Sequence, residues 1–368
     1  MDRETTRIYE RHAAEWIAAR RPRAVEDGRL DAFARRIRPG GLVLDLGCGP
    51  GWYAAHLREN SVRCIAADVA LAMLAAAGAR TPGLPCLQAD AAALPVKARS
   101  LDGVWASACY QHLPRHDLPC ALAQLHMAMR PGAPLEMSLV QLTEQRATAD
   151  ELLCGEAERR FTKEFPGRLF SLHTPARAAA LFEGAGFERI EIDSHQDFWL
   201  TVRARRARSL PDLVGPGLRL LICGLNPSLY AADAGVPFAR PGNRFWPAAR
   251  AAGVIARERD PLAAFRHGVG MTDLVKRATV GAAEVRREEY VAGMQRVEAV
   301  VRLYQPGATC FVGLEGWRRA VNRRAAPGWI PHGFGGRPAY LMPSTSGRNA
   351  AVPLDELAAH LSRAVRPS

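Results

Sequence analysis

Short apolar runs alternate with longer amphipathic segments from residue 42 onward, whereas residues 1–38 follow a helical pattern rich in charges. In the first half of the chain this pattern predicts strands at 42–46, 62–68, 85–90, 101–106 and 134–139. It also predicts helices near 52–59, 70–79, 117–129 and 176–185, and a closing hairpin made of 187–192 and 198–202. Such alternation of strand and helix is typical of a doubly wound parallel sheet.

The pattern restarts after a basic, turn-rich stretch that begins with Arg203 and ends with Gly217. Further strands are expected at 218–223, 271–275, 308–312 and 338–342, with helices near 244–252, 260–266, 287–304, 315–324 and 354–365. We therefore expect an α/β protein with two doubly wound, three-layer αβα domains, at 1–202 and 218–368. Because basic runs with turn formers mark domain junctions, residues 203–217 are interpreted as a linker.

Length and composition agree with two folded domains. The chain has 368 residues, of which 48% are hydrophobic and 23% charged, so it has enough apolar residues for two cores. No apolar run approaches the roughly 18 residues of a membrane span, and the polar start suggests no signal peptide. We expect a cytoplasmic protein. The eight scattered cysteines form no C-x-x-C pair, which favours buried free thiols and no metal site.

The net charge of +12 is unevenly distributed along the chain. Residues 209–368 hold 21 lysines and arginines against 12 acidic residues, a net charge of +9, whereas residues 1–208 carry only +3. This excess fits a polyanionic partner for the second half, because cations on phosphates release counterions. Solvated charged faces would give the same totals, so charge alone leaves both readings open.

A glycine-rich turn follows the first predicted strand, in the segment Asp45-Leu46-Gly47-Cys48-Gly49-Pro50-Gly51. Glycines at this place allow a ligand to approach the backbone closely where the chain enters a helix. Acidic residues end the next two strands: Asp68 is placed to take ribose hydroxyls, and Asp90, beside Ala91, to contact the edge of a base. A dinucleotide site is the alternative, but its fingerprint is G-x-G-x-x-G.

The acidic residue before a G-x-G-x-G turn, together with the later turn Arg130-Pro131-Gly132, resembles class I S-adenosylmethionine-dependent methyltransferases. The resemblance covers roughly residues 8–202. It implies that S-adenosylmethionine is the cofactor and that seven residues hold it: Asp45, Gly47, Gly49, Gly51, Asp68, Asp90 and Ala91. A sheet-forming domain that has lost its ligand remains the alternative.

The methyl acceptor is not identified by any motif. The chain has neither the Asn/Asp-Pro-Pro-aromatic tetrapeptide of amino-methylating DNA enzymes nor a well-placed Pro-Cys nucleophile. Its Gln111-His112-Leu113-Pro114 segment is similar to the branch that methylates small molecules. His112 is a candidate general base, because the ordinary pKa of histidine is near neutrality, although a hydrogen-bonded loop histidine is an equal alternative.

Two further motifs lie in the second half of the chain. An apolar strand leads into Gly224-Leu225-Asn226-Pro227-Ser228, which is followed by 237–246, Pro-Phe-Ala-Arg-Pro-Gly-Asn-Arg-Phe-Trp. The second motif is 342–349, Met-Pro-Ser-Thr-Ser-Gly-Arg-Asn. The first places the carboxamide of Asn226 at the carboxyl end of a strand, where open α/β sheets build their sites.

Together these motifs resemble the mismatch-specific uracil/thymine-DNA glycosylases. The resemblance implies that a nucleotide is flipped out of double-stranded DNA at a G·U or G·T mismatch. It implies that Asn226 holds the attacking water, in place of the aspartate of more efficient uracil-specific enzymes. An amide takes no proton, so slow chemistry is expected. Since neither motif contains a lysine for a Schiff base, the product would be an intact abasic site.

The resemblance also implies contacts to the flipped base. Phe238 stands where the family has its stacking aromatic residue, and Asn243 is expected to cap the next helix and brace the pocket. Ala231 leaves room for a 5-methyl group, which would allow thymine. Asp273 is placed to accept the N3–H of the base, but its charge would repel the base anion.

The second motif is expected to grip the DNA. Arg348 stands where thymine-acting members insert an arginine into the vacated space, while Ser344 and Ser346 would hold flanking phosphates. Gly347 replaces the usual alanine and is expected to loosen this loop. Ser228 replaces a usual glycine, which would weaken binding if that position needs a positive φ.

We interpret the chain as a bifunctional fusion of a methyltransferase with a uracil/thymine-DNA glycosylase. One alternative is a methyltransferase whose second domain binds mismatched DNA with little base excision. Another is a second domain that cleaves a free nucleoside. The charge of 209–368 and the expected wedge, Arg348, favour DNA.

Overall fold

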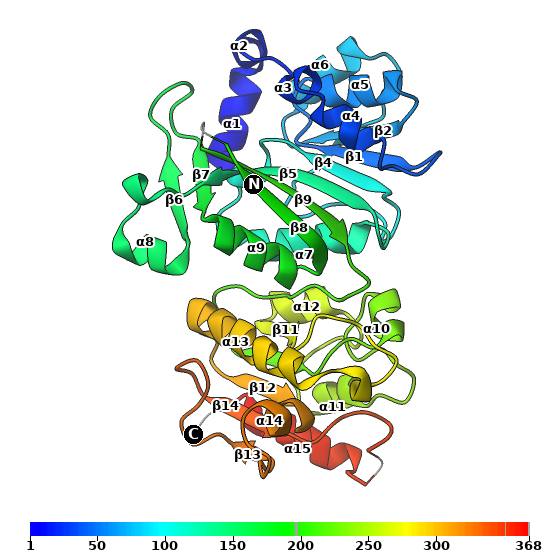
Figure 1. The fold of residues 1–368 in the computed structure, drawn as a ribbon, viewed down its shortest axis with the longest axis vertical. Helices are drawn as coiled ribbons and strands as arrows, with labels where there is room; N and C mark the ends of the chain where they lie inside the picture. The colour runs from blue at the N-terminus through cyan, green and yellow to red at the C-terminus, as the bar shows by residue number, and fades with distance from the viewer. Residues whose placement is uncertain (196–197, 350, 367–368) are drawn as a thin grey trace. The chain divides into compact units, whose positions relative to one another are not determined.

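The structure is a computed structural model that describes residues 1–195, 198–349 and 351–366. The chain divides into two compact units, of which the first contains residues 1–183 and 187–207 (Figure 1). The second unit contains residues 208–368 together with 184–186. Each unit is built on its own β-sheet, in agreement with the predicted α/β class.

The first unit opens with four short helices, α1 (Arg3–Arg11), α2 (Ala13–Ala18), α3 (Arg23–Glu26) and α4 (Arg29–Ala34). Strands and helices then alternate: β1 (Leu42–Leu46), α5 (Trp52–Glu59), β2 (Arg63–Asp68), α6 (Leu71–Arg80), β3 (Cys86–Gln88), β4 (Gly103–Ala106), a 3₁₀ turn (Tyr110–His112), α7 (Leu118–Ala128) and β5 (Pro134–Gln141). The remaining elements are a 3₁₀ turn (Glu144–Arg146), α8 (Ala149–Cys154), β6 (Glu156–Arg160), β7 (Leu169–His173), α9 (Pro175–Gly184), β8 (Phe187–Ser194) and β9 (Trp199–Arg206).

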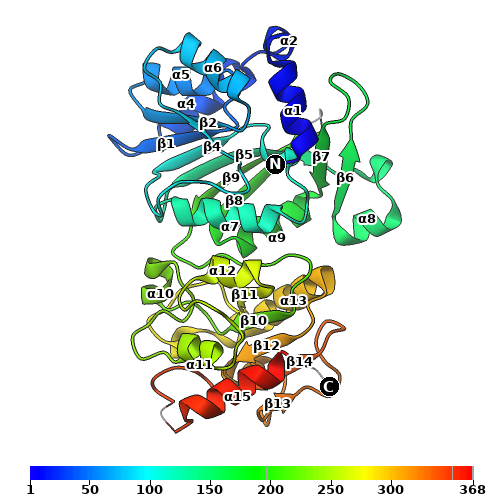
Figure 2. The same ribbon diagram turned by 180° about the vertical axis from the view of Figure 1, so that it is seen from behind.

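The nine strands of this unit form one sheet in the order β3-β2-β1-β4-β5-β7-β6, with β9 paired to β5 and β8 paired to β9. The six neighbouring strands β3, β2, β1, β4, β5 and β7 are parallel to one another. The predicted hairpin of β8 and β9 closes the sheet, with β9 antiparallel to both β5 and β8. Figure 2 shows α4, α5 and α6 on one face of the sheet and α7 on the other. The predicted three-layer arrangement is therefore confirmed for this unit.

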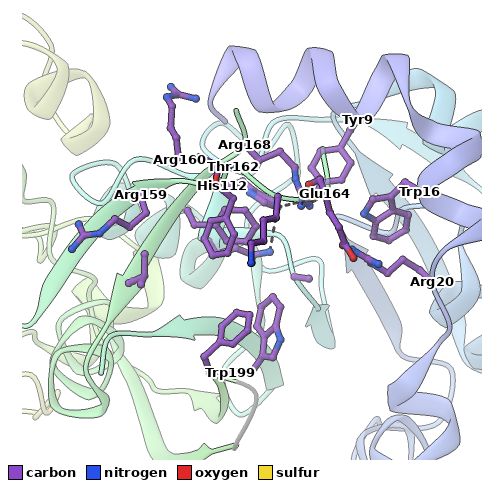
Figure 3. A pocket seen from close by; sticks show the side chains of 17 residues that line it. Tyr9, Trp16, Arg20, His112, Arg159, Arg160, Thr162, Glu164, Arg168 and Trp199 are labelled. Atoms are coloured by element: carbon purple, nitrogen blue, oxygen red, sulfur yellow. Dashed lines mark hydrogen bonds and ion pairs between the residues drawn. The ribbon is translucent and has the colours of Figure 1, made fainter. Parts of the chain in front are cut away.

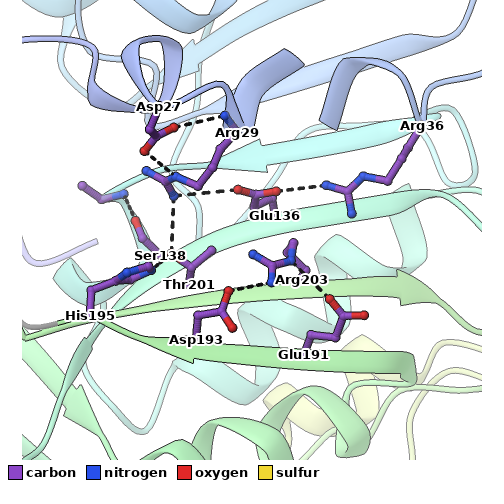
Figure 4. A network of polar contacts seen from close by, with 11 residues as sticks. Asp27, Arg29, Arg36, Glu136, Ser138, Glu191, Asp193, His195, Thr201 and Arg203 are labelled. Carbon is purple, nitrogen blue, oxygen red and sulfur yellow. Dashed lines mark hydrogen bonds and ion pairs between the residues drawn. The ribbon is translucent and has the colours of Figure 1, made fainter. Parts of the chain in front are cut away.

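A buried carboxylate connects the helical start of the first unit to its sheet. Glu136 of β5 is 4% exposed and lies 3.0 Å from Arg36 and 3.8 Å from Arg29. Figure 4 shows these charges in a row beside Arg203 of β9, which pairs with Glu191 and Asp193 of β8. Two guanidinium groups offset the cost of burying the charge of Glu136, so this contact fixes the start of α4 on the sheet.

The second unit contains β10 (Leu220–Gly224), α10 (Leu229–Ala234), α11 (Phe245–Ala251), α12 (Pro261–Arg266), β11 (Val269–Asp273), a 3₁₀ turn (Ala282–Glu284) and α13 (Arg287–Tyr304). It continues with β12 (Thr309–Val312), α14 (Glu315–Ala320), β13 (Gly328–Trp329), β14 (Ala339–Met342) and α15 (Leu354–Ala364). Its sheet has the order β11-β10-β12-β14-β13, in which only β13 is antiparallel to its neighbour.

Alternate side chains of β10 enter two separate cores. Leu220 and Ile222 pack with residues of α11 and α15, whereas Leu221 and Cys223 pack with residues of α13. Since successive side chains of a strand point to opposite faces, the sheet is buried on both sides. The second unit is therefore also a three-layer αβα domain, as predicted.

The predicted linker over residues 203–217 is wrong, because both of its halves belong to folded units. Residues 203–206 are the end of β9, and Arg206 is 1% exposed with its guanidinium donating to the carbonyl oxygen of His126. In the second half, Asp212 is buried and pairs with Lys276 at 2.8 Å and Arg296 at 2.5 Å. The second unit therefore begins near residue 208 rather than 218.

Five of the eight cysteines are buried, as the sequence predicts for free thiols, but Cys86 is exposed. Among the described residues, no helix has both the length and the apolar character needed to cross a membrane.

Candidate functional site

The glycine-rich turn of the first unit lies between β1 and α5 and adopts the conformation that its glycines predict. Gly47 and Gly49 have φ angles of +70° and +52°, a region that favours glycine. A Cβ at Gly47 would lie 2.4 Å from the Cβ of Cys109, so a larger residue does not fit there. The turn therefore exposes its backbone at the carboxyl edge of the sheet.

Asp68 ends β2 beside this turn. Its Oδ2 accepts a hydrogen bond from the backbone N–H of Gly49 at 2.9 Å, and its Oδ1 accepts one from Ala70 at 2.9 Å. Burial raises the pKa of this carboxyl above its usual value. Each carboxylate oxygen keeps a second lone pair, so Asp68 can still accept hydrogen bonds from a pair of hydroxyl groups.

A small cavity of about 70 Å³ lies above the turn. Its lining includes four of the predicted cofactor residues, Gly47, Gly49, Asp68 and Ala91, with apolar side chains such as Met73. These residues fit a nucleoside: the carboxylate of Asp68 can accept from hydroxyl groups, the glycines leave their backbone accessible, and the apolar side chains can flank a base. The space is below the roughly 300–1,000 Å³ of small-molecule sites, and Met1 and Trp16 also line it.

Three predicted cofactor residues lie outside the lining of this cavity. Asp45 is 1% exposed, accepts the N–H of Ala54 at 3.0 Å and has a pKa raised by burial to about 7. Its place is thus beneath the turn, at the start of α5. Gly51 packs against α6, where a Cβ would lie 2.7 Å from that of Ala77. The carboxylate of Asp90 is paired with the amino group of Met1 at 2.7 Å.

A second cavity of about 780 Å³ shares four lining residues with the first: Tyr9, Trp16, Ala108 and His112 (Figure 3). The two cavities are therefore adjacent within the first unit. The larger one is also lined by the β6–β7 hairpin, for which the sequence predicted no strands. Its strand β6 reads Glu-Ala-Glu-Arg-Arg, a polar pattern that hides a strand.

His112 is not free to act alone as a general base. Its Nδ1 lies 2.7 Å from the carbonyl oxygen of Leu169, so Nδ1 carries the hydrogen and Nε2 is the acceptor. The hydroxyl of Tyr9 lies 2.8 Å from Nε2 and donates to it. Burial lowers the pKa of His112 to about 4, so the ring is neutral at neutral pH. Among the described residues, the Tyr9 hydroxyl and the amide nitrogen of Gln111, at 3.3 Å, lie within hydrogen-bonding distance of Nε2, and of these two the hydroxyl is the group that can pass a proton to it.

In the second unit, Asn226 follows the carboxyl end of β10, as the sequence predicts. Its Nδ2 donates to the carbonyl oxygen of Arg277 at 3.1 Å and to Oγ1 of Thr279 at 2.8 Å. Since a carbonyl only accepts, these contacts fix which end of the amide is nitrogen. Among the described residues none donates to Oδ1, so this oxygen is available to a water molecule.

Thr279 is a site residue that the sequence did not reveal. It is 3% exposed, and its hydroxyl accepts from Asn226 while donating to the carbonyl oxygen of Gly281 at 2.9 Å. A backbone bridge between Ser228 and Thr279 holds the two segments together. The orientation of the Asn226 amide therefore depends on a residue 53 positions later in the chain.

Asp273 and Phe238 meet at the tip of β10. Gly224 is the register partner of Asp273, and a Cβ at Gly224 would lie 2.4 Å from Oδ1 of Asp273 and 3.3 Å from Cζ of Phe238. Phe238 has a φ of +56° and stacks on Phe245, with ring centroids 4.1 Å apart. The structure thus brings the predicted stacking ring and the predicted carboxylate together.

The carboxylate of Asp273 is costly to bury. The residue is 7% exposed, and no described residue donates a hydrogen bond to its side chain. Burial raises its pKa to about 6, against the opposing charge of Lys276. An acceptor in this state is suited to a ligand N–H.

The remaining residues of the first motif have mainly structural contacts. The N-cap of α11 is Arg244 rather than Asn243, and it has no side-chain capping hydrogen bond; Oδ1 of Asn243, one residue earlier, accepts the N–H of Phe245 at 2.9 Å. Ala231 is 3% exposed in a small core cluster with Leu210 and Ala239. Ser228 has a φ of −72° and caps α10, so the position needs no glycine.

The second motif follows β14 and is fastened to the first. Arg244 donates from its backbone to the carbonyl oxygen of Thr345 at 2.9 Å. Its guanidinium donates to the carbonyl oxygens of Val352 at 2.5 Å and Asn349 at 2.6 Å. The loop that carries the second motif therefore has a fixed position relative to α11.

Within this loop, Arg348 is exposed, while Ser344 and Ser346 are half-buried. Each serine hydroxyl accepts a backbone N–H two residues later, at 3.3 and 3.4 Å. At Gly347, a Cβ would lie 2.9 Å from the carbonyl oxygen of Gly242. The glycine permits close contact between the two motifs.

Comparisons with known proteins agree with this division. Residues 43–132 match the family model of a methyltransferase domain, and residues 211–364 match that of the uracil DNA glycosylase superfamily. Similar solved structures include methyltransferases from Methanosarcina mazei and Mesorhizobium loti, with 15% and 21% identity and a TM-score of 0.40 each. Each covers 48% of this chain, over 97% and 96% of its own length. A DhpI–SAH complex shows 21% identity and a TM-score of 0.42, over 55% of this chain and 96% of its own. The domain assignments rest on the two family models.

Proposed function

The chain joins a methyltransferase domain to a domain of the uracil DNA glycosylase superfamily, and from this premise we propose a bifunctional enzyme. The second unit would remove uracil from G·U mismatches in double-stranded DNA, and thymine from G·T mismatches at a lower rate. The first would transfer a methyl group from S-adenosylmethionine. The observation that carries the glycosylase proposal is the Asn226 amide, whose nitrogen is fixed and whose oxygen is available.

In the proposed reaction, Oδ1 of Asn226 accepts a hydrogen bond from water and directs its oxygen at C1′ of a flipped nucleotide. The new C–O bond forms as the bond from C1′ to the base breaks, and its electron pair leaves with the base. Because an amide takes no proton, the proton of the water passes to solvent. The rate would therefore depend on the stability of the departing base anion.

The other predicted contacts complete this site. Phe238 would stack on the flipped base, and Asp273 would accept its N3–H. Arg348 would enter the space that the base has left, while Ser344 and Ser346 would contact flanking phosphates. Ala231 would affect thymine through the packing of α10, since its side chain lies in the core. Asn243 would hold the start of α11, next to Phe238.

For Thr279→Val, we expect base release from a G·U duplex to fall about tenfold, because Asn226 loses the shortest of the contacts that orient its amide. Thr279→Ser keeps the hydroxyl and should remain within about twofold of the wild type. Single-turnover release of uracil, with duplex binding measured alongside, separates the two effects. Equal rates in the valine and serine variants would contradict a positioning role.

The pH dependence of uracil recognition should reflect Asp273. Its pKa is about 6, so the carboxylate is ionised above pH 6 and protonated below it. An ionised carboxylate accepts N3–H and a protonated one does so poorly, so KM should be roughly tenfold higher at pH 5 than at pH 7.5. In Asp273→Asn, whose amide oxygen accepts at every pH, this step in KM should disappear. A step of the same size in both proteins would assign the titration to another group.

For the first unit, the residues present fit S-adenosylmethionine. Asp68 would accept the ribose hydroxyls, the turn of Gly47 and Gly49 would contact the amino-acid end, and Ala91 would pack against the base. Once bound, the sulfonium supplies an electrophilic methyl group. Asp45, Gly51 and Asp90 would support this site from outside the cavity.

Two measurements on the full chain test the proposal. Calorimetric titration with S-adenosylmethionine should show one site, and incubation with a G·U duplex should yield an intact abasic site. Binding of the duplex without an abasic product would favour a mismatch-binding module. Cleavage of free uridine in the absence of DNA would instead indicate nucleoside metabolism.

A further inference from the structure

The larger cavity of the first unit has a lining of unusual chemistry. Six aromatic side chains surround its volume of about 780 Å³: Tyr9, Trp16, Phe161, Phe170, Phe198 and Trp199. Five basic residues also line it, but only one acidic residue, Glu164. Aromatic walls favour a flat ring, and the excess of positive charge favours an anion.

Arg168 is the basic residue that decides the ligand chemistry. It is 6% exposed, and its guanidinium donates to the Tyr9 hydroxyl at 3.2 Å and to two backbone carbonyl oxygens. No carboxylate of the described residues forms an ion pair with it. A cation buried among neutral partners is costly unless an anion compensates it.

The loop before Arg168 is shaped to hold this guanidinium. The carbonyl oxygens that accept from it belong to Glu164, at 2.7 Å, and Phe165, at 3.2 Å. Both residues have positive φ angles, of 38° and 55°, a region that residues other than glycine rarely adopt. Strain of this kind persists where the surroundings enforce it and clusters at ligand sites.

The other well-placed cations of this cavity already have partners. Arg20 pairs with Glu164 at 2.5 Å, Arg159 with Glu151 at 2.6 Å, and Arg160 with Asp2 at 2.9 Å. Lys163 is exposed to solvent. Arg168 is therefore the buried charge that a ligand would neutralise, and Figure 3 shows it beside Tyr9 and His112.

We propose that this cavity binds the methyl acceptor, and that the acceptor is a small aromatic hydroxy acid whose anionic group pairs with Arg168. The proposal rests on the methyltransferase function proposed above. The ring of the acceptor lies among the aromatic side chains, and its hydroxyl points to the junction with the smaller cavity, where Tyr9 and His112 line both.

This arrangement also gives a route for the proton. Tyr9 donates to Nε2 of His112 and accepts from Arg168, which leaves its oxygen able to accept from the acceptor hydroxyl. As the acceptor oxygen bonds to the methyl carbon, the electron pair of the broken carbon–sulfur bond stays on sulfur. The hydroxyl proton moves to Tyr9 while the Tyr9 proton moves to Nε2 of His112, and the protonated His112 then loses one proton to solvent. The products are a methyl ether and S-adenosylhomocysteine.

The test compares 4-hydroxybenzoate with its neutral analogue 4-hydroxybenzamide, using the full chain and its tryptophan fluorescence. We expect the acid to bind at least tenfold more tightly than the amide. In Arg168→Gln the affinity for the acid should fall about tenfold and that for the amide should not change. Arg63→Gln, which removes an exposed cation away from the cavity, should leave both affinities unchanged.

Equal affinities of the wild type for the acid and the amide would overturn the proposal, whether or not Arg168→Gln folds. Undiminished affinity of a folded Arg168→Gln for the acid would also overturn it. Calorimetry with S-adenosylmethionine on the same wild-type sample separates this outcome from failure of the methyltransferase proposal. Arg168-dependent binding of the acid without binding of S-adenosylmethionine would retain the anion site and reject methyl transfer.

Discussion

Replacing Asn226 by alanine is expected to lower uracil release from a G·U duplex by roughly 10²-fold or more, because the attacking water loses its only proposed guide. Duplex binding should stay within about twofold, since the contacts proposed for the DNA backbone lie in the second motif. Single-turnover kinetics with saturating enzyme measure the first effect, and fluorescence anisotropy measures the second.

Asn322→Ala is a suitable control for this substitution. Asn322 is an exposed asparagine of the same unit, and its side chain accepts the N–H of Arg324, two residues later, at 3.0 Å. It should retain wild-type rates. If Asn226→Ala retained them as well, the role of its amide would be refuted. A parallel loss of duplex binding would mean that the substitution disturbs the first motif as a whole.

For Asp68→Ala, we expect the affinity for S-adenosylmethionine to fall about 100-fold or more. The variant loses the proposed acceptor of the ribose hydroxyls, and hydrogen bonds to a charged group are worth about 1.5–3 kcal/mol each. It also releases the N–H groups of Gly49 and Ala70, which hold the turn. Calorimetric titration is the measurement.

Asp150→Ala is the control for this substitution, because it also removes one carboxylate but at an exposed position of α8. It should bind S-adenosylmethionine like the wild type. Uracil release should be the same in both aspartate variants, because that reaction depends on the other unit. An Asp68→Ala protein with undiminished affinity would show that the ribose is held elsewhere.

Local patterns predicted much of this fold because central strands of its sheets, such as β4 and β10, are buried on both faces. Strand β10 is a continuous apolar run, and α13 was predicted with its observed bounds, 287–304. The glycine turn was also recognisable, since only glycine tolerates the positive φ at Gly47 beside Cys109. Such features depend on neighbouring residues and are therefore visible in the sequence.

Features that depend on distant contacts were missed or misplaced. The basic run at 203–206 was interpreted as a linker, yet it alternates between buried and half-buried positions along β9. Nothing near Thr279 in the sequence indicates that its hydroxyl orients Asn226, because the two residues meet only after the chain folds. Asp45 stands beside the glycine turn in the sequence, but its side chain lies beneath it.

Arg244 connects the second motif to the start of α11, so one residue supports both parts of the proposed DNA site. The backbone N–H of Arg244 holds the loop before Arg348, the residue proposed to fill the DNA helix, and its guanidinium holds the chain after it. Arg244 is also the N-cap of the helix behind the stacking ring. A mutation at this arginine would therefore disturb both the entry of Arg348 into the DNA helix and the stacking of Phe238 on the flipped base. Natural variation in specificity should accumulate around Arg244 while that side chain itself stays constant.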